Sequence, residues 1–182
     1  MGIRQAPDPV KLIIGILAAS PQALAEVRGR LIALWGTIDG ESPAIPFSFT
    51  GYYENEMGSG LLRQWVSFDR LIEQDELSAI KVTTNALEDE RALSGKRTVN
   101  LDPGYLTLSR LVLASTKDFS HRIYLARGVY GEVTLIYKAG RFEALPWTYP
   151  DYLSAAALTF LMSVRSTYHM QFKQLPQRAE LR

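Results

Sequence analysis

The feature that most constrains the fold is a run of apolar residues close to the start of the sequence, Lys11–Ala19. It contains β-branched isoleucines and lacks polar alternation, which is typical of a strand buried on both faces. Ser20 and Pro21 follow, and these residue types favour the N-cap and first position of a helix. Four apolar residues then repeat at helical spacing: Leu24, Val27, Leu31 and Leu34. The chain is therefore predicted to begin with a central strand and an amphipathic helix, which Gly36 ends.

Composition favours one ordinary globular domain. The chain has 182 residues, 47% of them hydrophobic, so we expect residues 1–182 to form one unit with flexible ends at 1–9 and 176–182. The net charge is only +1, which disfavours a nucleic-acid partner because such proteins usually carry a basic excess. The sequence has no cysteine, and no run approaches the ~20 apolar residues of a membrane span. We therefore expect a cytoplasmic protein without a membrane partner.

The first half of the chain continues as alternating strands and helices. Pro43–Phe49 is predicted as an edge strand because of its prolines, and Leu61–Phe68 as the next strand. Asp75 is predicted to cap a helix that runs to about Leu93, before a strand near Arg97–Leu101. The resulting order, β-α-β-β-α-β, is that of ferredoxin-like folds.

The second half predicts two hairpins. A three-residue loop at 126–128 would set the register of the first. The expected pairs are Leu125 with Val129, Ile123 with Gly131, His121 with Val133, Tyr124 with Tyr130, and Arg122 with Glu132. A turn at Ala139 and Gly140 would pair Tyr137 with Phe142, whereas Leu108–Ser115 fits either a strand or a short helix.

The end of the chain predicts one more helix, capped by Asp151 and amphipathic through about Leu175. The expected fold is therefore a single α+β domain. Its mixed or antiparallel sheet has a ferredoxin-like β-α-β-β-α-β start, two added hairpins and a C-terminal amphipathic helix.

Three short polar segments, 49–60, 100–105 and 115–122, carry the candidate site residues. Carboxylates, amides and tyrosines there are candidates for ligand binding, together with two cations that suit an anion: Tyr53, Glu54, Glu56, Asn100, Tyr105, Lys117 and Arg122. Asp102 and His121 are the candidate catalytic residues, because a carboxylate and an imidazole can exchange protons near neutral pH.

Each segment also has a purely structural interpretation. Residues 49–60 fit a surface loop anchored by its aromatic residues, and Asp102-Pro103-Gly104 fits a turn in which Asp102 accepts backbone amides. Arg122 could simply pair with Glu132 across the hairpin, with His121 at the edge of the core. A fourth segment, Trp147–Tyr152, fits either an exposed contact surface or a loop that docks the last helix.

Several known motifs are absent. Gly95-Lys96 does not complete a P-loop, because Glu90 and Arg97 occupy its other required positions. No dinucleotide-binding glycine pattern and no Gly-x-Ser-x-Gly elbow is present. The two histidines are 48 residues apart, so no metal site is predicted, and the sequence names no cofactor.

The four segments Phe47–Gly58, Asn100–Thr107, Thr116–Leu125 and Leu145–Tyr152 together resemble a bacterial family of unknown function. Their motifs are Phe-Thr-x-Tyr-Tyr-x-x-Glu-Met-Gly, Asn-Leu-Asp-Pro-Gly-Tyr-Leu-Thr, Ser-His-Arg-Ile-Tyr-Leu and Leu-Pro-Trp-Thr-Tyr-Pro-Asp-Tyr. The resemblance implies a small cytosolic protein. Gly51 stands where the family pattern is acidic, so no cation-binding role is carried to that position. Some relatives bear a GTP-binding label, which only a phosphate site other than a P-loop would support here.

Two functions are compatible with these residues. The first is binding of a small phosphate-bearing or otherwise anionic ligand, with or without catalysis, in one pocket shared by the three polar segments. The second is a non-catalytic interaction module, in which Tyr124, Tyr130 and Trp147 meet a protein partner or a second copy in a homodimer.

Overall fold

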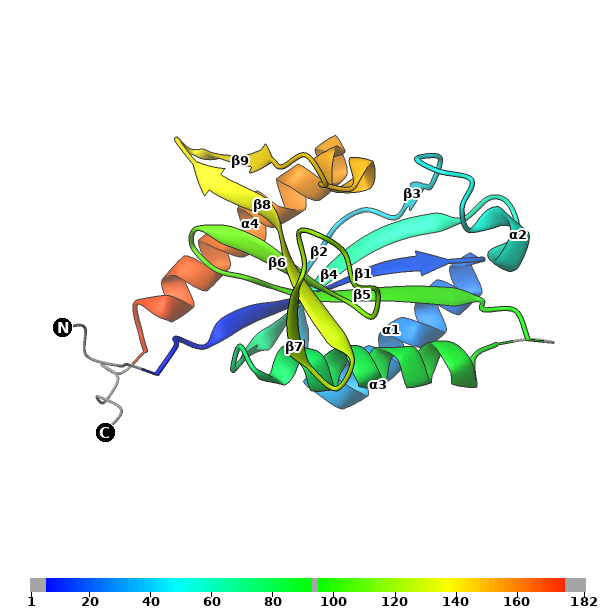
Figure 1. The fold of residues 1–182 in the computed structure, drawn as a ribbon, viewed down its shortest axis with the longest axis horizontal. Coiled ribbons are helices and arrows are strands. Elements are labelled where there is room, and N and C mark those ends of the chain that lie inside the picture. The colour runs from blue at the N-terminus through cyan, green and yellow to red at the C-terminus, as the bar shows by residue number, and fades with distance from the viewer. Residues whose placement is uncertain (1–5, 93–94, 176–182) are drawn as a thin grey trace.

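The computed structural model describes residues 6–92 and 95–175 (Figure 1). The strands are β1 Val10–Ala18, β2 Ile38–Glu41, β3 Ile45–Pro46, β4 Leu62–Ile72, β5 Val99–Leu106, β6 Arg110–Ser115, β7 Ile123–Ala126, β8 Val129–Lys138 and β9 Arg141–Ala144. The helices are α1 Pro21–Trp35, α2 Glu54–Met57, α3 Glu76–Glu90, the 3-10 helix η1 Pro150–Leu153 and α4 Ala155–Phe172. None of these helices is long and apolar enough to cross a membrane. Most of the predicted flexible ends, and the predicted helix end at residue 93, lie outside the described residues.

The strands form one antiparallel sheet in the order β2-β4-β1-β5-β6-β8-β7, with β3 on β4 and β9 on β8. Four neighbouring strands of this sheet, β2-β4-β1-β5, follow one another in the chain as β1, α1, β2, β4, α3, β5. In the sheet, β4 lies between β1 and β2, and β1 lies between β4 and β5. Each β-α-β connection therefore passes over one intervening strand, as in ferredoxin-like folds. The predicted α+β class and its β-α-β-β-α-β start are confirmed. Leu108–Ser115, left open above, contains a strand, β6.

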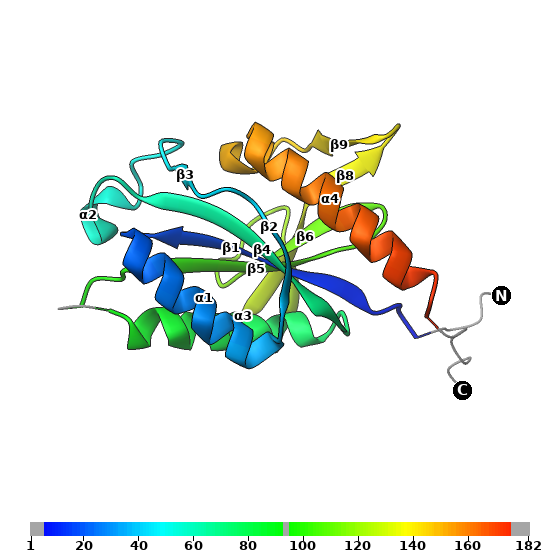
Figure 2. The same ribbon diagram turned by 180° about the vertical axis from the view of Figure 1, so that it is seen from behind.

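The sheet lies between two helical layers (Figure 2). Leu12, Ile14 and Ile16 of β1 pack into the cluster that contains the apolar faces of α1 and α3. Ile13, on the other face, packs into the cluster that contains α4. The apolar run is continuous because β1 is covered by helices on both sides.

The edge beside β4 differs from the prediction. Instead of one strand over 43–49, β2 and the two-residue β3 pair with successive parts of β4. Pro43 and Pro46 restrict pairing in the predicted segment. The sequence of β2, Ile-Asp-Gly-Glu, is too polar to indicate a strand.

The turn predicted at Asp102-Pro103-Gly104 is wrong, because β5 runs straight through it. Pro103 lies opposite Ile14 of β1, whereas β6 pairs with β5 only from Gly104 onward. The proline therefore stands where β5 has a partner on one side only, a position that tolerates a missing N–H. A side chain at Gly104 would collide with the Val112 carbonyl oxygen, so glycine permits the close approach of β6.

The two hairpins confirm three of the six predicted strand pairs: Tyr137 faces Phe142, and Ile123 and Tyr124 face Gly131 and Tyr130. His121 and Arg122 precede β7 and are not strand partners of Val133 and Glu132, although Arg122 does form an ion pair with Glu132. The predicted three-residue loop is wrong: Arg127 and Gly128, with φ of 56° and 74°, form a two-residue turn that pairs Ala126 with Val129. The extra residue is absorbed by an irregularity at Leu125, so its predicted pairing with Val129 does not form.

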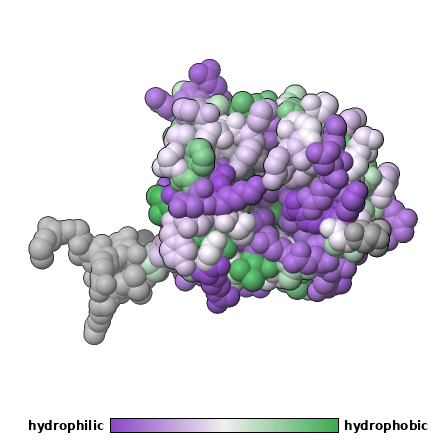
Figure 3. All heavy atoms as spheres, turned by 45° about the vertical axis from the view of Figure 1, so that its right-hand side comes forward, coloured by the Kyte–Doolittle hydropathy of each residue, from purple (hydrophilic) through white to green (hydrophobic). Residues whose placement is uncertain are grey.

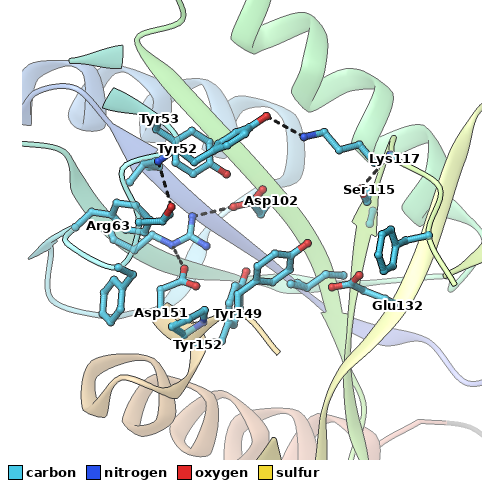
Figure 4. Close-up of a pocket in the computed structure, with 18 of the residues that line it drawn as sticks. Tyr52, Tyr53, Arg63, Asp102, Ser115, Lys117, Glu132, Tyr149, Asp151 and Tyr152 are labelled. Atoms are coloured by element: carbon cyan, nitrogen blue, oxygen red, sulfur yellow. Dashed lines mark hydrogen bonds and ion pairs between the residues drawn. The ribbon is translucent and has the colours of Figure 1, made fainter. Parts of the chain in front are cut away.

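The loop before the last helix docks that helix onto the sheet. The Trp147 indole N–H donates to the Val133 carbonyl at 2.8 Å, and its ring stacks on His121. Asp151 is not the cap of α4, because Ser154 takes that role by accepting from the Ala157 N–H. Asp151 lies one turn earlier, in η1, where its carboxylate points toward the sheet (Figure 4).

Candidate functional site

A cavity of about 590 Å³ opens on the α4 side of the sheet, between the segment before α2, the β6–β7 connection and η1. Its walls are largely aromatic: Phe47, Phe49, Tyr52, Tyr53, Phe119, Tyr149 and Tyr152. Its charged lining residues are Arg63, Lys117, Arg122, Asp102, Asp118, Glu132 and Asp151. The surface turned toward the α2 side of the molecule shows interspersed hydrophilic and hydrophobic residues rather than one apolar patch (Figure 3).

The floor of the cavity is built around Arg63 of β4, which is 2% exposed (Figure 4). Its Nη1 donates to Asp102 Oδ2 at 2.9 Å. Its Nε lies 2.9 Å from Asp151 Oδ2, close enough for an ion pair but not aligned as a hydrogen bond. The guanidinium also lies 5.0 Å and 5.4 Å from the ring centroids of Trp65 and Tyr152.

Gly15 of β1 makes room for this arrangement. A Cβ at this position would lie 2.8 Å from Arg63 Nη2 and 2.9 Å from the Tyr152 hydroxyl. Both distances are too short for non-bonded atoms, so the floor exists because the central strand lacks a side chain here.

The two carboxylates beside Arg63 are electrostatically different. Burial would raise the pKa of Asp102, but the charges of Arg63 and Lys81 outweigh it, and the pKa lies below its usual value. Burial raises the pKa of Asp151 more than Arg63 lowers it, so that pKa lies above its usual value. A pair whose pKa values are pushed apart can hold one carboxylate ionised while the other accepts a proton.

A second layer of polar residues holds Asp102. Asn100 Nδ2 donates to Asp102 Oδ1 at 3.0 Å, and Asn100 Oδ1 accepts from Arg97 Nη1 at 3.0 Å. Arg97 in turn pairs with Glu56 of α2 at 2.6 Å and 2.7 Å and with Glu88 of α3 at 2.8 Å. Glu56 and Asn100 therefore tie the wall to the floor rather than line the cavity.

The cations nearer the mouth have different partners. Arg122 is already engaged: its Nε donates to Glu132, its Nη1 to the Lys117 carbonyl and its Nη2 to the Tyr149 hydroxyl, at 2.7–2.8 Å. Lys117 Nζ instead donates to the neutral hydroxyl of Tyr52 at 3.0 Å. That hydrogen bond lowers the pKa of Tyr52. Lys117 is therefore the lining cation best placed to meet an anion.

The structure brings four predicted site residues into one lining: Tyr53, Asp102, Lys117 and Arg122. The other five lie elsewhere: Glu54, Glu56, Asn100, Tyr105 and His121. Glu54 is exposed on α2, and the Tyr105 side chain lies in the cluster on the other face of the sheet. His121 stands behind the lining, with Nε2 2.9 Å from Glu132 Oε2. The predicted partners Asp102 and His121 thus contact different charged residues.

Sequence reasoning missed Arg63 and Asp151, the central residues of the floor. A lone arginine inside a predicted buried strand was the available signal, since such a charge must find a partner. Nothing in the sequence indicated that the partner of Arg63 would be Asp151, 88 positions later. No group of three or more histidines and carboxylates in the described part of the chain is arranged to hold a metal ion.

These features define an α+β protein with an antiparallel sheet between two helical layers and an aromatic cavity with an ionic floor. The chain belongs to the family described as Domain of unknown function (DUF4416), whose model matches residues 8–168. This confirms the expected membership of a family of unknown function, and the match spans every strand of the sheet. No curated protein and no solved structure matches the chain.

Proposed function

We propose that this protein binds a small organic ligand in the cavity and that the ligand carries one anionic group, such as a phosphate, near Lys117. The supporting observation is the convergence of four distant segments, 47–53, 102, 113–122 and 149–152, on one cavity with a buried ionic floor. Its volume is in the range of small-molecule sites, about 300–1,000 Å³. A reducing cytoplasm is part of this proposal, in keeping with the absence of cysteine.

The free-energy cost of burying the ions of the cavity floor supports a role for them beyond stability. Removing ions from water costs several kcal/mol per ion, and apolar residues of similar volume often stabilise a fold as well or better. Arg63, Asp102 and Asp151 nevertheless adjoin open space rather than filling the interior of the protein. Titratable groups with perturbed pKa values in a cleft are typical of functional sites.

The test is a thermal-shift screen of nucleotides, phosphorylated metabolites and other small acids. A ligand at 100 times its Kd adds about 2.7 kcal/mol of stability, and each kcal/mol raises Tm by about 2–4 °C in a chain of this size. We expect Lys117→Ala to weaken binding of the anionic hit about tenfold or more, because a charge-assisted contact is lost.

Lys138→Ala is the matched control, because Lys138 is exposed at the end of β8 and does not line the cavity. The control should bind as the unmodified protein does. Equal weakening by both substitutions would contradict a specific anion site at Lys117, and a screen without any hit would count against ligand binding itself.

A second candidate function is self-association or protein binding through the edge strand β7. Ile123 and Tyr124 are 75% and 58% exposed there, and β7 pairs on one side only. Trp147, which the sequence also suggested for this surface, does not belong to it, because its ring stacks on His121 and its indole N–H donates to the Val133 carbonyl. We expect Tyr124→Ala to abolish any dimer seen by light scattering while the monomer stays folded by circular dichroism. A dimer unchanged by Tyr124→Ala, or a protein that is monomeric at all concentrations, would argue against this surface.

A further inference from the structure

We infer that the ligand of this cavity also carries a cationic amine, which enters the floor and is held between Asp102, Asp151 and the Tyr152 hydroxyl. This inference rests on the proposed function. It makes the ligand a zwitterion, with its anion at the mouth and its ammonium at the floor, as in a phosphorylated amine.

The first argument is the charge of the floor. Two carboxylates, Asp102 and Asp151, share one guanidinium, and Lys81, the other cation that acts on Asp102, has Glu88 as its own partner. The group therefore carries a surplus negative charge when both aspartates are ionised. The side chains of Arg63 and Asp151 are only 3% and 8% exposed, so water compensates little of that surplus. The Asp102 side chain is 28% exposed and lines the cavity, so it can be reached from the open side. An ammonium placed there would supply the missing positive charge.

The second argument is a buried hydroxyl that can still accept a hydrogen bond. Tyr152 is 1% exposed and lines the cavity, and its hydroxyl makes no aligned hydrogen bond in the described part of the chain. The Trp65 indole N–H, which also lacks an aligned partner, is near enough to donate to this hydroxyl. Because an indole N–H can only donate, the hydroxyl keeps a lone pair that can accept from a bound group. An ammonium has three N–H donors, and the floor offers three acceptors in the two carboxylates and this hydroxyl.

The third argument concerns the aromatic wall of the cavity. Tyr53 and Tyr149 line the cavity with Tyr152, and aromatic faces attract organic cations. Burial raises the pKa of Tyr53, which keeps its hydroxyl neutral and its ring free of competing negative charge. A carboxylate or phosphate at the floor would instead face Asp102 and Asp151. The charge pattern therefore orients the ligand, with Lys117 and the floor selecting opposite ends.

The test compares matched compounds on the unmodified protein. O-phosphoethanolamine, 3-aminopropyl phosphate and phosphotyramine are each paired with the analogue in which hydroxyl replaces the amine. Calorimetry and thermal shift should show at least one amine binding tenfold or more tighter than its hydroxyl analogue. Analogues that bind as well as the amines would overturn the inference and leave the proposed function standing. If no compound of either kind binds but other anions do, the amine inference also fails, and if nothing binds at all, both fail.

Two substitutions locate the amine. Asp102→Asn should weaken the amine by tenfold or more while leaving the weaker hydroxyl analogue unchanged. Asp89→Asn is the control, because Asp89 is an exposed carboxylate of α3 that does not line the cavity. Equal effects of the two substitutions would place the amine elsewhere and overturn the inference.

Discussion

Arg63→Met is expected to lower the free energy of unfolding by about 3–5 kcal/mol, because it leaves Asp102 and Asp151 without their shared cation. Methionine fills much of the arginine volume, so the loss reports charge more than an empty space. At about 2–4 °C per kcal/mol, Tm should fall by roughly 6–20 °C. Urea unfolding followed by circular dichroism measures both quantities.

Two further variants separate this effect from general damage. Arg141→Ala breaks an exposed ion pair with Glu143 and should change stability by about 0–1 kcal/mol. Adding Asp151→Asn to Arg63→Met should restore part of the loss, because one unpaired buried charge is removed. A double variant that is as unstable as the sum of the two single variants would show that the ions are not coupled.

Gly15→Ala is the second substitution with a large expected effect. The added methyl group would lie within 3 Å of both Arg63 and Tyr152, so one of them must move. We expect a loss of about 1–3 kcal/mol from overpacking, together with loss of the thermal shift produced by any ligand of the cavity. Denaturant unfolding and the ligand screen measure the two effects on the same protein.

Gly29→Ala is expected to change stability in the opposite direction from Gly15→Ala. Gly29 lies in the interior of α1, where an added Cβ has no atom within 4 Å, so alanine should stabilise the helix by about 0.5–1 kcal/mol. Ligand binding should be unaffected. Stabilisation by both glycine substitutions would mean that the space beside Arg63 is larger than the structure indicates.

The fold was largely accessible from the sequence because its signals are local. The run Lys11–Ala19 and the cap at Ser20 specify β1 and α1 within their own segments, and the ferredoxin-like order follows from repeating such units. The errors occurred where a distant partner overrides local preference. Asp-Pro-Gly normally turns the chain, but pairing of β5 with the full length of β1 keeps Pro103 extended.

The site was only partly predictable for the same reason. Alternation placed Asn100 and Asp102 on one side of their strand, and they do contact each other at 3.0 Å. The cross-strand pair Arg122–Glu132 was also expected, but as one interpretation of an exposed hairpin, whereas Glu132 is 2% exposed. The partnership of Arg63 with Asp151 depends on how η1 returns to β4, which no local pattern encodes.

The position of Asp151 also sets the order in which the cavity is completed as the chain is synthesised. The ferredoxin-like unit, residues 10–106, contains both Arg63 and Asp102, so this ion pair can form once that unit has folded. Asp151, Tyr149 and Tyr152 emerge from the ribosome more than 40 residues later. A nascent chain that has folded its first unit therefore has Arg63 and Asp102 of the cavity floor in place but still lacks Asp151, Tyr149 and Tyr152. A ligand of the kind proposed would therefore stabilise only molecules in which this last segment has docked.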